Sequence, residues 1–497
     1  MLFKNTAAQS ADLLTAYGFS VLLAPLMLHR LGLELFGVWA VTGAMATYAG
    51  LLDLGITRSL ARFIALYDVA EDRTAIRECV GLGLVAVSAV GALSAVAAVV
   101  TAPLFAAALD SIGTGDLRLV LLCSVAIFCF TAYRRVLNSV DVGLRRMVPP
   151  NVANVFTNVL NFGFSVAALL AQPDLVAYGV ANALSYLLGI GAAVAAVRHV
   201  WGSVPVKWPS RARARQIVSF GAKTQLHAVA DLVNLQTDKL IIAFAIGVRA
   251  AATYEIAARV VLAARSVGLL TISAMIPTVA AHIAQHGREA LRRLYRRYTT
   301  VTVGLSYPVL GLTCVTSPYL LHAWLDEVPP RTIGVVVLLT ASYLLPLAAE
   351  VAMNVAVGDG RPGLVSSNSV VTAAVNLALT AFLAPLLGFW GVLAGTVVAL
   401  SAGSLVFVAR FLRIYGLPSR DHVTAVGPPA ALALGLTLAM VGVGMLTGWD
   451  TGSRWHSAIV VVSCVAVYAV VYWPLAGRLG FLPDKLTLPA LRRRQLA

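Results

Sequence analysis

The chain alternates between long apolar runs and short polar connections. Fourteen runs reach the length of about 20 residues that a helix needs to cross a lipid bilayer. The expected spans are 7–28, 35–57, 79–103, 117–139, 149–171, 174–197, 218–246, 251–281, 298–320, 332–357, 363–386, 389–411, 424–447 and 456–477. The runs are too long for membrane strands and show no sustained alternation, which excludes a β-barrel. The pattern therefore predicts an all-α fold with about 14 transmembrane helices.

Composition agrees with a polytopic membrane protein. The chain has 497 residues, of which 59% are hydrophobic and only 12% charged, where soluble proteins carry roughly 25% charged residues. This excludes a string of soluble domains, a disordered tail protein and a disulfide scaffold. The cysteines stand singly, at Cys79, Cys123, Cys129, Cys314 and Cys464, so we expect neither disulfides nor a metal site, and no cofactor.

The basic residues are distributed unevenly between the two sides of the membrane. With the N-terminus in the cytoplasm, the inner loops and ends carry 28 Lys and Arg, and the outer loops carry 5. Such an excess of positive charge in short inner loops sets the orientation of membrane proteins. We therefore expect both termini in the cytoplasm, and a topological origin for the net charge of +15 rather than a nucleic-acid partner. The first run lacks an A-x-A cleavage site and is expected to be a retained helix.

The sequence contains an internal repeat at an offset of 215 residues. Val100-Thr101-Ala102-Pro103 matches Val315-Thr316-Ser317-Pro318, and a series of matches follows at Gly143/Gly358, Arg146/Arg361, Thr157/Thr372 and Asn161/Asn376. Each repeat would hold six helices, so both halves would share one orientation, as in transporters whose binding site lies between parallel repeats.

The repeat predicts the domain organisation. We expect a six-helix lobe over residues 1–200, a cytoplasmic linker over 201–217 and a second six-helix lobe over 218–420. Residues 421–497 would form two extra helices and a basic cytoplasmic tail.

Ionisable residues inside spans face a cavity or a partner, because a bare charge in the bilayer is costly. One face of the seventh span carries the densest set, Lys223, His227, Asp231, Asn234 and Asp238, with Lys239 beside it. The eighth span adds Glu255, Arg259 and Arg265. From their depths we expect ion pairs between Asp231 and Arg265 and between Asp238 and Arg259. These pairs would either line a central cavity or only lock the two helices together.

The first lobe carries a second polar set. Asn151, Asn154, Asn158 and Asn161 share one face of the fifth span, which suits interhelical hydrogen bonds or a wet cavity wall. Asp12 lies at the inner end of the first span. Arg58, Arg134 and Arg135 lie near the inner ends of the second and fourth spans, as topology anchors or as phosphate ligands.

Two further motifs carry little functional information. Gly81-Leu82-Gly83-Leu84-Val85-Ala86 imitates a dinucleotide fingerprint, but it opens a membrane helix with no strand before it. Arg288 to Arg297 is a basic amphipathic stretch that we expect to anchor to anionic lipid.

Two segments resemble a known family. Leu31 to Ala40 (LGLELFGVWA) with Gly50 to Ile56 (GLLDLGI) is similar to the first two helices of bacterial O-antigen-type polysaccharide transporters. Gln236 to Ile242 (QTDKLII), Tyr254 to Ala257 (YEIA) and Ile276-Pro277 resemble helices 7 and 8 of the same family. These proteins belong to the multidrug/oligosaccharidyl-lipid/polysaccharide (MOP) exporter superfamily.

The resemblance implies a flippase of the bacterial cytoplasmic membrane rather than an enzyme. Its substrate would be an undecaprenyl-diphosphate-linked oligosaccharide, moved outward by alternating access and driven by H⁺ or Na⁺. Membrane lipids, a polysaccharide polymerase and glycosyltransferases would be its partners. The motif carries over Asp238 and Lys239.

Charge and position add further candidates to the motif residues. The candidate cationic cavity comprises Arg58, Arg134, Arg135, Lys239, Arg259 and Arg265. The candidate ion-coupling and polar residues are Asp12, Lys223, His227, Asp231, Asp238, Glu255, Asn154 and Asn158.

Three other functions remain open. A multidrug (MATE-like) cation antiporter would need an acidic, aromatic-rich cavity, whereas this chain places basic residues in its spans. A membrane-embedded glycosyltransferase or polymerase would need larger outer loops, and a scaffold would need no buried charges.

Overall fold

A computed structural model describes residues 2–53, 55–109, 111–273, 276–448 and 450–482. Within these ranges the described side chains exclude those of residues 2–7, 10, 52, 58, 223–224, 226–228, 231, 269–290 and 447.

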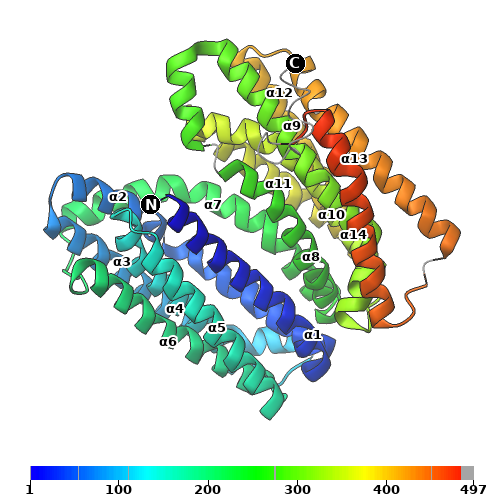
Figure 1. Ribbon diagram of the computed structural model, residues 1–497. Helices are drawn as coiled ribbons and strands as arrows, with labels where there is room; N and C mark the ends of the chain where they lie inside the picture. Colours follow the sequence, from blue (N-terminus) through cyan, green and yellow to red (C-terminus); the bar gives the residue numbers. More distant parts are fainter. Residues whose placement is uncertain (1, 54, 110, 274–275, 449, 483–497) are drawn as a thin grey trace. The chain divides into compact units, whose positions relative to one another are not determined.

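The described residues fold into α-helices and one 3₁₀ helix, so the predicted all-α membrane fold is confirmed (Figure 1). The elements are α1 (Leu2–Ala49), η1 (Gly50–Asp53), α2 (Ile56–Val69), α3 (Arg73–Leu109), α4 (Thr114–Gly143), α5 (Val148–Ala171), α6 (Leu175–Trp201), α7 (Arg211–Ala245), α8 (Val248–Ser273), α9 (Ile276–Leu325), α10 (Thr332–Gly358), α11 (Pro362–Leu387), α12 (Phe389–Tyr415), α13 (Ser419–Thr447) and α14 (Arg454–Arg478).

Twelve of the 14 predicted spans each fall on one helix to within a residue at either end, whereas the span 35–57 crosses from α1 through η1 to α2 and the span 251–281 runs past the end of α8 at Ser273. Among the described residues, 11 helices are long and apolar enough to cross a membrane. One of them, α1, contains the first predicted span and most of the second, and Gly32 between them has a φ of 82°, a backbone conformation that glycine adopts without steric cost. The helix α7 coincides with the predicted span 218–246, and α8 covers residues 251–273 of the predicted span 251–281; the two helices carry the ionisable residues noted above.

The second predicted span differs from a continuous helix. Regular α-helix ends at Ala49, the 3₁₀ helix η1 follows, and α2 begins at Ile56 after Gly55, whose φ is +73°. The amide of Gly55 donates to Asp53 Oδ1 at 2.7 Å, so the carboxylate satisfies one backbone group at the interruption. A side chain at position 55 would collide with the backbone of Gly221 on α7.

The chain divides into two compact units. The first comprises residues 1–232 and 239–252, and the second comprises 233–238 and 253–497. Six residues of α7 therefore belong to the second unit. The expected lobes 1–200 and 218–420 stay a prediction, because this division falls within α7 and α8.

Each unit has its own helical packing. In the first unit α4 packs against α3 and α6, and α5 packs against α1 and α6 (Figure 1). In the second unit α10 packs against α9 and α12, and α11 packs against α12. The helices α13 and α14 both pack against α9.

The turns at the end of α4 and α10 have matching conformations. Arg145 has a φ of 59° and Gly360, 215 residues later, has a φ of 76°. In each turn the next amide closes the same hydrogen bond: Arg146 N donates to Asp141 O at 2.8 Å, and Arg361 N donates to Ala356 O at 2.9 Å. The same hydrogen bond also closes the ends of α2, α7, α12 and α14, so it is a common helix ending, and the duplication stays a prediction.

The segment before α7 is fastened to α3. Glu78, which is buried, accepts hydrogen bonds from the amide and hydroxyl of Ser210 at 3.2 and 2.9 Å. Arg213 Nε lies 2.9 Å from the same carboxylate. The amide of Lys207 also donates to Arg77 O at 3.1 Å, so the connection lies fixed along α3.

Close packing explains the glycines of the false dinucleotide fingerprint. A Cβ on Gly81 would lie 1.9 Å from the carbonyl oxygen of Lys207, and one on Gly83 would collide with Leu60 and Val136. Both positions need glycine for packing.

Two arginines of the basic stretch 288–297 make contacts inside the protein, while the expected anchoring of the stretch to anionic lipid stays a prediction. Arg292 forms two hydrogen bonds with the buried carboxylate of Asp421, at 2.6 and 2.9 Å. Arg297 donates to the carbonyls of Gly480 and Leu482 at 2.5 and 2.9 Å. These arginines fasten α13 and the segment after α14 to α9.

Candidate functional site

The first unit gathers four of the predicted residues into one polar cluster. Asn154 Nδ2 on α5 donates to Asp12 Oδ2 on α1 at 2.8 Å, and Asn158 Nδ2 donates to Asp12 Oδ1 at 3.1 Å. Arg134 Nη2 on α4 donates to Asn154 Oδ1 at 2.5 Å. The asparagine stripe therefore makes interhelical hydrogen bonds that link α1, α4 and α5.

Arg134 is buried, with 6% of its surface exposed. Its guanidinium lies over the Tyr186 ring, 5.9 Å from the centroid. Within the described part of the chain its Nε has no hydrogen-bond partner. Since a buried donor without a partner is costly, this guanidinium retains capacity for another acceptor. Its neighbour Arg135 lines a separate cavity of about 340 Å³ in the same unit.

In the second unit, the buried Asp238 carboxylate lies among hydroxyl and carbonyl oxygen atoms, a group that we call the Asp238 ring. The carboxylate is 1% exposed, and its Oδ2 accepts hydrogen bonds from the Thr396 hydroxyl at 2.5 Å and the Tyr254 hydroxyl at 3.4 Å. Asn376 Oδ1 and the Val392 carbonyl oxygen lie 3.2 and 3.3 Å from Thr396 Oγ1. Residues of α7, α8, α11 and α12 thus converge on one buried carboxylate.

The Thr396 hydroxyl cannot satisfy all of these acceptors. A hydroxyl donates one hydrogen, while the Asp238 carboxylate, the Asn376 amide oxygen and the Val392 carbonyl oxygen each accept. Thr380 also directs its hydroxyl to Asn376 Oδ1, at 3.4 Å. The Thr396 hydroxyl therefore joins the Asp238 carboxylate to the Asn376 amide, and the Val392 carbonyl beside it is also the ordinary backbone acceptor one turn earlier on α12.

The other ionisable residues of the second unit make different contacts from those expected. Arg259 Nε forms an ion pair with Glu255 on its own helix at 2.9 Å. The described contacts of Asp238 are with hydroxyls, so the expected Asp238–Arg259 pair is not among the ion pairs of the described residues. The guanidinium of Arg265 lies over the Tyr343 ring, 4.7 Å from its centroid.

Several predicted residues lie outside the described side chains. They are Arg58, Lys223, His227 and Asp231. The expected Asp231–Arg265 pair therefore also lies outside the described side chains and stays a prediction. Lys239 is described and buried, in the part of α7 that belongs to the first unit.

Most of the residues around Asp238 were not predicted from the sequence as site residues. Thr396 and Val392 stand in an apolar helix with no polar pattern, so no sequence signal marked them. Asn376 was visible as the repeat partner of Asn161, and both make hydrogen bonds to the following helix: Asn161 to Asn182, and Asn376 to Thr396. The repeat was the available signal.

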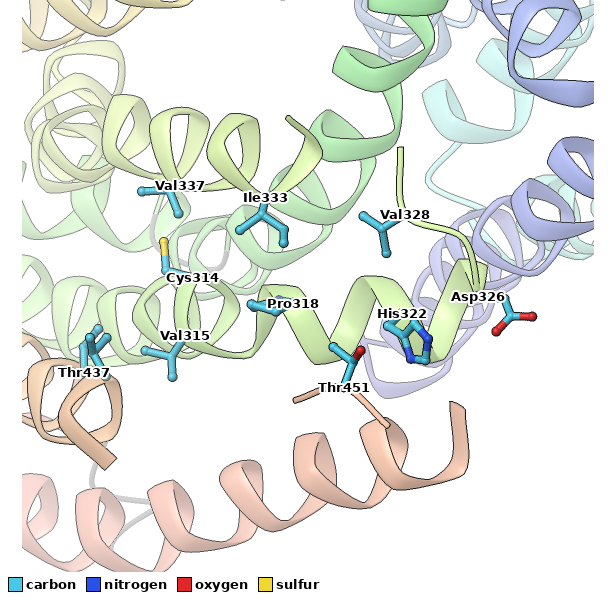
Figure 2. A pocket seen from close by; sticks show the side chains of 11 residues that line it. Cys314, Val315, Pro318, His322, Asp326, Val328, Ile333, Val337, Thr437 and Thr451 are labelled. Atoms are coloured by element: carbon cyan, nitrogen blue, oxygen red, sulfur yellow. The ribbon is translucent and has the colours of Figure 1, made fainter. Parts of the chain in front are cut away.

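A larger and mostly apolar cavity lies elsewhere in the second unit. Its volume is about 700 Å³, and α9, α10 and α13 contribute most of its lining (Figure 2). His322 and Asp326 lie toward the end of α9 (Figure 2), and His322 Nδ1 lies 3.1 Å from Ser457 Oγ. Its lining includes none of the residues predicted from the sequence.

Solved structures of membrane transporters share this fold. The lipid II flippase MurJ in an inward closed conformation has a TM-score of 0.69 at 12% identity, covering 95% of this chain and 99% of its own. An inward-facing MATE family multidrug transporter of the MOP superfamily has a TM-score of 0.68 at 15% identity, covering 83% and 98%.

A third similar structure is a MOP superfamily transporter from Pyrococcus furiosus described as having a binding pocket of reverse polarity. Its TM-score is 0.52 at 14% identity, and it covers 83% of this chain and 96% of its own. At these identities the likeness establishes the fold. No curated protein matches the chain.

A family model supplies the sequence relationship. The model for polysaccharide biosynthesis proteins matches residues 2–282, which is more than half of the 497 residues. This multi-pass membrane protein with a MOP superfamily fold therefore belongs to the polysaccharide biosynthesis protein family.

Proposed function

We propose that this protein flips an undecaprenyl-diphosphate-linked oligosaccharide from the cytoplasmic to the outer leaflet of the bacterial cytoplasmic membrane. Both termini would lie in the cytoplasm, as the distribution of basic residues predicts. The transport cycle would expose the substrate site to the two sides alternately. Glycosyltransferases would supply the substrate, and a polysaccharide polymerase would consume it.

The observation that carries this proposal is the extent of the flippase likeness. The lipid II flippase covers 95% of this chain, whereas the two other transporters cover 83%. The fold likeness to the lipid flippase thus extends over more of this chain than the likeness to the multidrug transporter, which favours a lipid flippase over a multidrug antiporter.

Buried cations support an anionic substrate. Arg134 and Lys239 are 6% and 7% exposed within membrane helices, where charges are rare unless they serve a site. Arginine matches phosphate oxygens with paired donors. Arg134, Arg135, Lys239, Arg259 and Arg265 are our candidates for contacting the diphosphate, with Arg58 among the candidates from sequence.

The Asp238 ring supports ion coupling. One proton or one Na⁺ would bind at Asp238, whose Oδ2 accepts from the Thr396 hydroxyl, with Asn376 Oδ1, 3.2 Å from the same hydroxyl, as a further oxygen ligand. Asp12, bonded to Asn154 and Asn158, is the corresponding candidate of the first unit. Glu255 remains a candidate, and Lys223, His227 and Asp231 remain candidates from sequence.

The proposal is tested in proteoliposomes loaded with a fluorescent undecaprenyl-diphosphate-linked oligosaccharide. We expect the purified protein to move the labelled headgroup across the bilayer faster than protein-free vesicles do. An imposed H⁺ or Na⁺ gradient should accelerate this movement. Export of a small organic cation, without movement of the lipid-linked sugar, would favour the antiporter function instead.

A variant series tests the cationic assignment. Replacing Arg134, Arg135, Lys239 and Arg259 together by Gln should abolish movement of the diphosphate lipid. The matched control replaces four arginines expected at the outer side by Gln: Arg30, Arg331 and Arg454 in outer loops, and Arg118 at the outer end of the predicted span 117–139. Movement at the wild-type rate in the first variant would refute the role of these cations.

A further inference from the structure

A cavity opens where the second membrane span is interrupted. It has a volume of about 340 Å³, and its lining comes from α1, η1, α2, α4 and α7, all within the first unit. Irregular backbone at membrane depth is tolerated where protein buries it or where it lines a hydrated cavity. The size is at the small end of the ~300–1,000 Å³ range of ligand pockets, so the cavity suits one small molecule.

Three residues that line this cavity each hold one fully buried polar atom that has no hydrogen-bond partner in the described part of the chain. These atoms are Thr57 Oγ1, Asn138 Oδ1 and Gln225 Oε1. Gln225 is 8% exposed, and its Nε2 donates to the Leu51 carbonyl at 3.1 Å, which fixes the side chain and leaves its oxygen unpartnered. Buried acceptors without partners are costly and rare. A ligand that brings hydrogen-bond donors would satisfy them.

The charges on the cavity argue against a simple ion. Asp53 and Arg135 both line it, so a bare cation would meet the guanidinium and a bare anion would meet the carboxylate. The remaining lining includes the Phe128 ring and the apolar side chains of Leu51 and Ala132. This combination suits a neutral molecule that has several hydroxyl groups and an apolar face.

We propose that this cavity binds one neutral sugar ring. Sugar hydroxyls would donate to Thr57 Oγ1, Asn138 Oδ1, Gln225 Oε1 and the Asp53 carboxylate, and one hydroxyl oxygen would accept from Arg135. The C–H face of the ring would lie against Phe128. The assignment of this sugar to the oligosaccharide of the transported lipid rests on the proposed function, whereas sugar binding itself does not.

The test measures binding without transport. Saturation-transfer NMR on the full-length protein in lipid nanodiscs uses glucose, galactose, mannose, rhamnose and N-acetylglucosamine as probes. We expect at least one sugar to give a transfer signal. Thr57→Val removes the unpartnered hydroxyl at constant shape, and it should weaken binding of that sugar by about three- to tenfold, the range for one hydrogen bond.

Thr372→Val is the matched control, because Thr372 Oγ1 is also buried without a partner among the described residues but lies in the second unit. It should leave sugar binding unchanged. Gln225→Met, which keeps the side-chain length, provides a second loss of an acceptor and should also weaken binding.

Three results would overturn the proposal: no signal from any of the five sugars, equal binding by wild type and Thr57→Val, or equal weakening by Thr57→Val and Thr372→Val. A fourth result would assign the cavity to a cation instead. In that case no sugar binds, the wild-type protein unfolds at a higher temperature in sodium chloride than in choline chloride, and Thr57→Val removes this difference. Sugar binding without lipid movement in proteoliposomes would refute the proposed function alone, and lipid movement without sugar binding would refute this cavity assignment alone.

Discussion

The hydroxyl of Thr396 on α12 lies 2.5 Å from the Asp238 carboxylate on α7, although 158 residues separate them in sequence. Both groups are buried, and the amide oxygen of Asn376 shares the same hydroxyl at 3.2 Å. This carboxylate is our candidate for binding the coupling proton or cation. The contact therefore connects a charge expected from sequence with partners that the sequence did not reveal.

Asp238→Asn should uncouple movement of the lipid from the ion gradient. Each charge moved through 100 mV contributes about 2.3 kcal/mol, so its loss lowers gradient-driven accumulation by up to about 50-fold. Initial rates in proteoliposomes with and without the gradient measure this effect. Ser404→Ala on the same helix is the control, because the Ser404 hydroxyl bonds only to the Leu400 carbonyl among its described contacts. Gradient stimulation that survives Asp238→Asn would exclude the residue as the coupling site.

Gly81→Ala should release the connection that precedes α7. The new methyl group would occupy the position of the Lys207 carbonyl oxygen, which lies 1.9 Å from the ideal Cβ. We expect trypsin to cleave at the exposed Lys207 several times faster than in wild type, measured by mass spectrometry of the fragments. Gly191→Ala on α6 is the control, since no atom lies within 4 Å of its ideal Cβ. Equal cleavage rates in the two variants would contradict the described contact.

Acid should loosen the same connection through Asp72. The hydrogen bond from the Ala75 amide, followed by that from Arg213, lowers the pKa of Asp72 below its ordinary value of 3.8. A lowered pKa stabilises the folded state above the ordinary value, and this contribution is lost as the pH falls through the folded pKa. Amide hydrogen exchange of Lys207 to Ser210, corrected for intrinsic rates, should therefore increase below about pH 4. Asp72→Asn should reduce this pH dependence, and an unchanged profile would show that Asp72 does not contribute.

Asp421→Asn should weaken the attachment of α13 to α9. Asp421 is 3% exposed and accepts two hydrogen bonds from Arg292. A hydrogen bond to a charged group contributes about 1.5–3 kcal/mol to stability, and solvent around the half-exposed arginine lowers this contribution. We expect a lower midpoint of thermal unfolding in detergent. Glu327→Gln, at an exposed position, should leave the midpoint unchanged. If the two variants unfold alike, the contact does not stabilise the fold.

Hydropathy predicted the helices well because the bilayer imposes their length and apolar character. The interruption before α2 was not predicted, because the apolar run continues through residues 50–56 and only Gly55 and Asp53 mark it. Hydropathy does not distinguish a continuous helix from a broken one.

Contacts between distant residues were the weakest part of the sequence analysis. Helical spacing placed Arg259 level with Asp238, but it paired with Glu255 one turn away, since a partner on the same helix is within reach. The partners of Arg292 and Arg297 were not predicted, because Asp421 and the carbonyls after α14 are distant in sequence. Charge pattern alone does not identify the partner of a charge.

The most direct measurement is movement of a labelled undecaprenyl-diphosphate-linked oligosaccharide in proteoliposomes that contain the purified protein. The account predicts gradient-stimulated appearance of the sugar at the opposite face, absent from protein-free vesicles and from the variant with Gln at positions 134, 135, 239 and 259. No movement above the protein-free level under either gradient, with the protein folded and correctly inserted, would contradict the account.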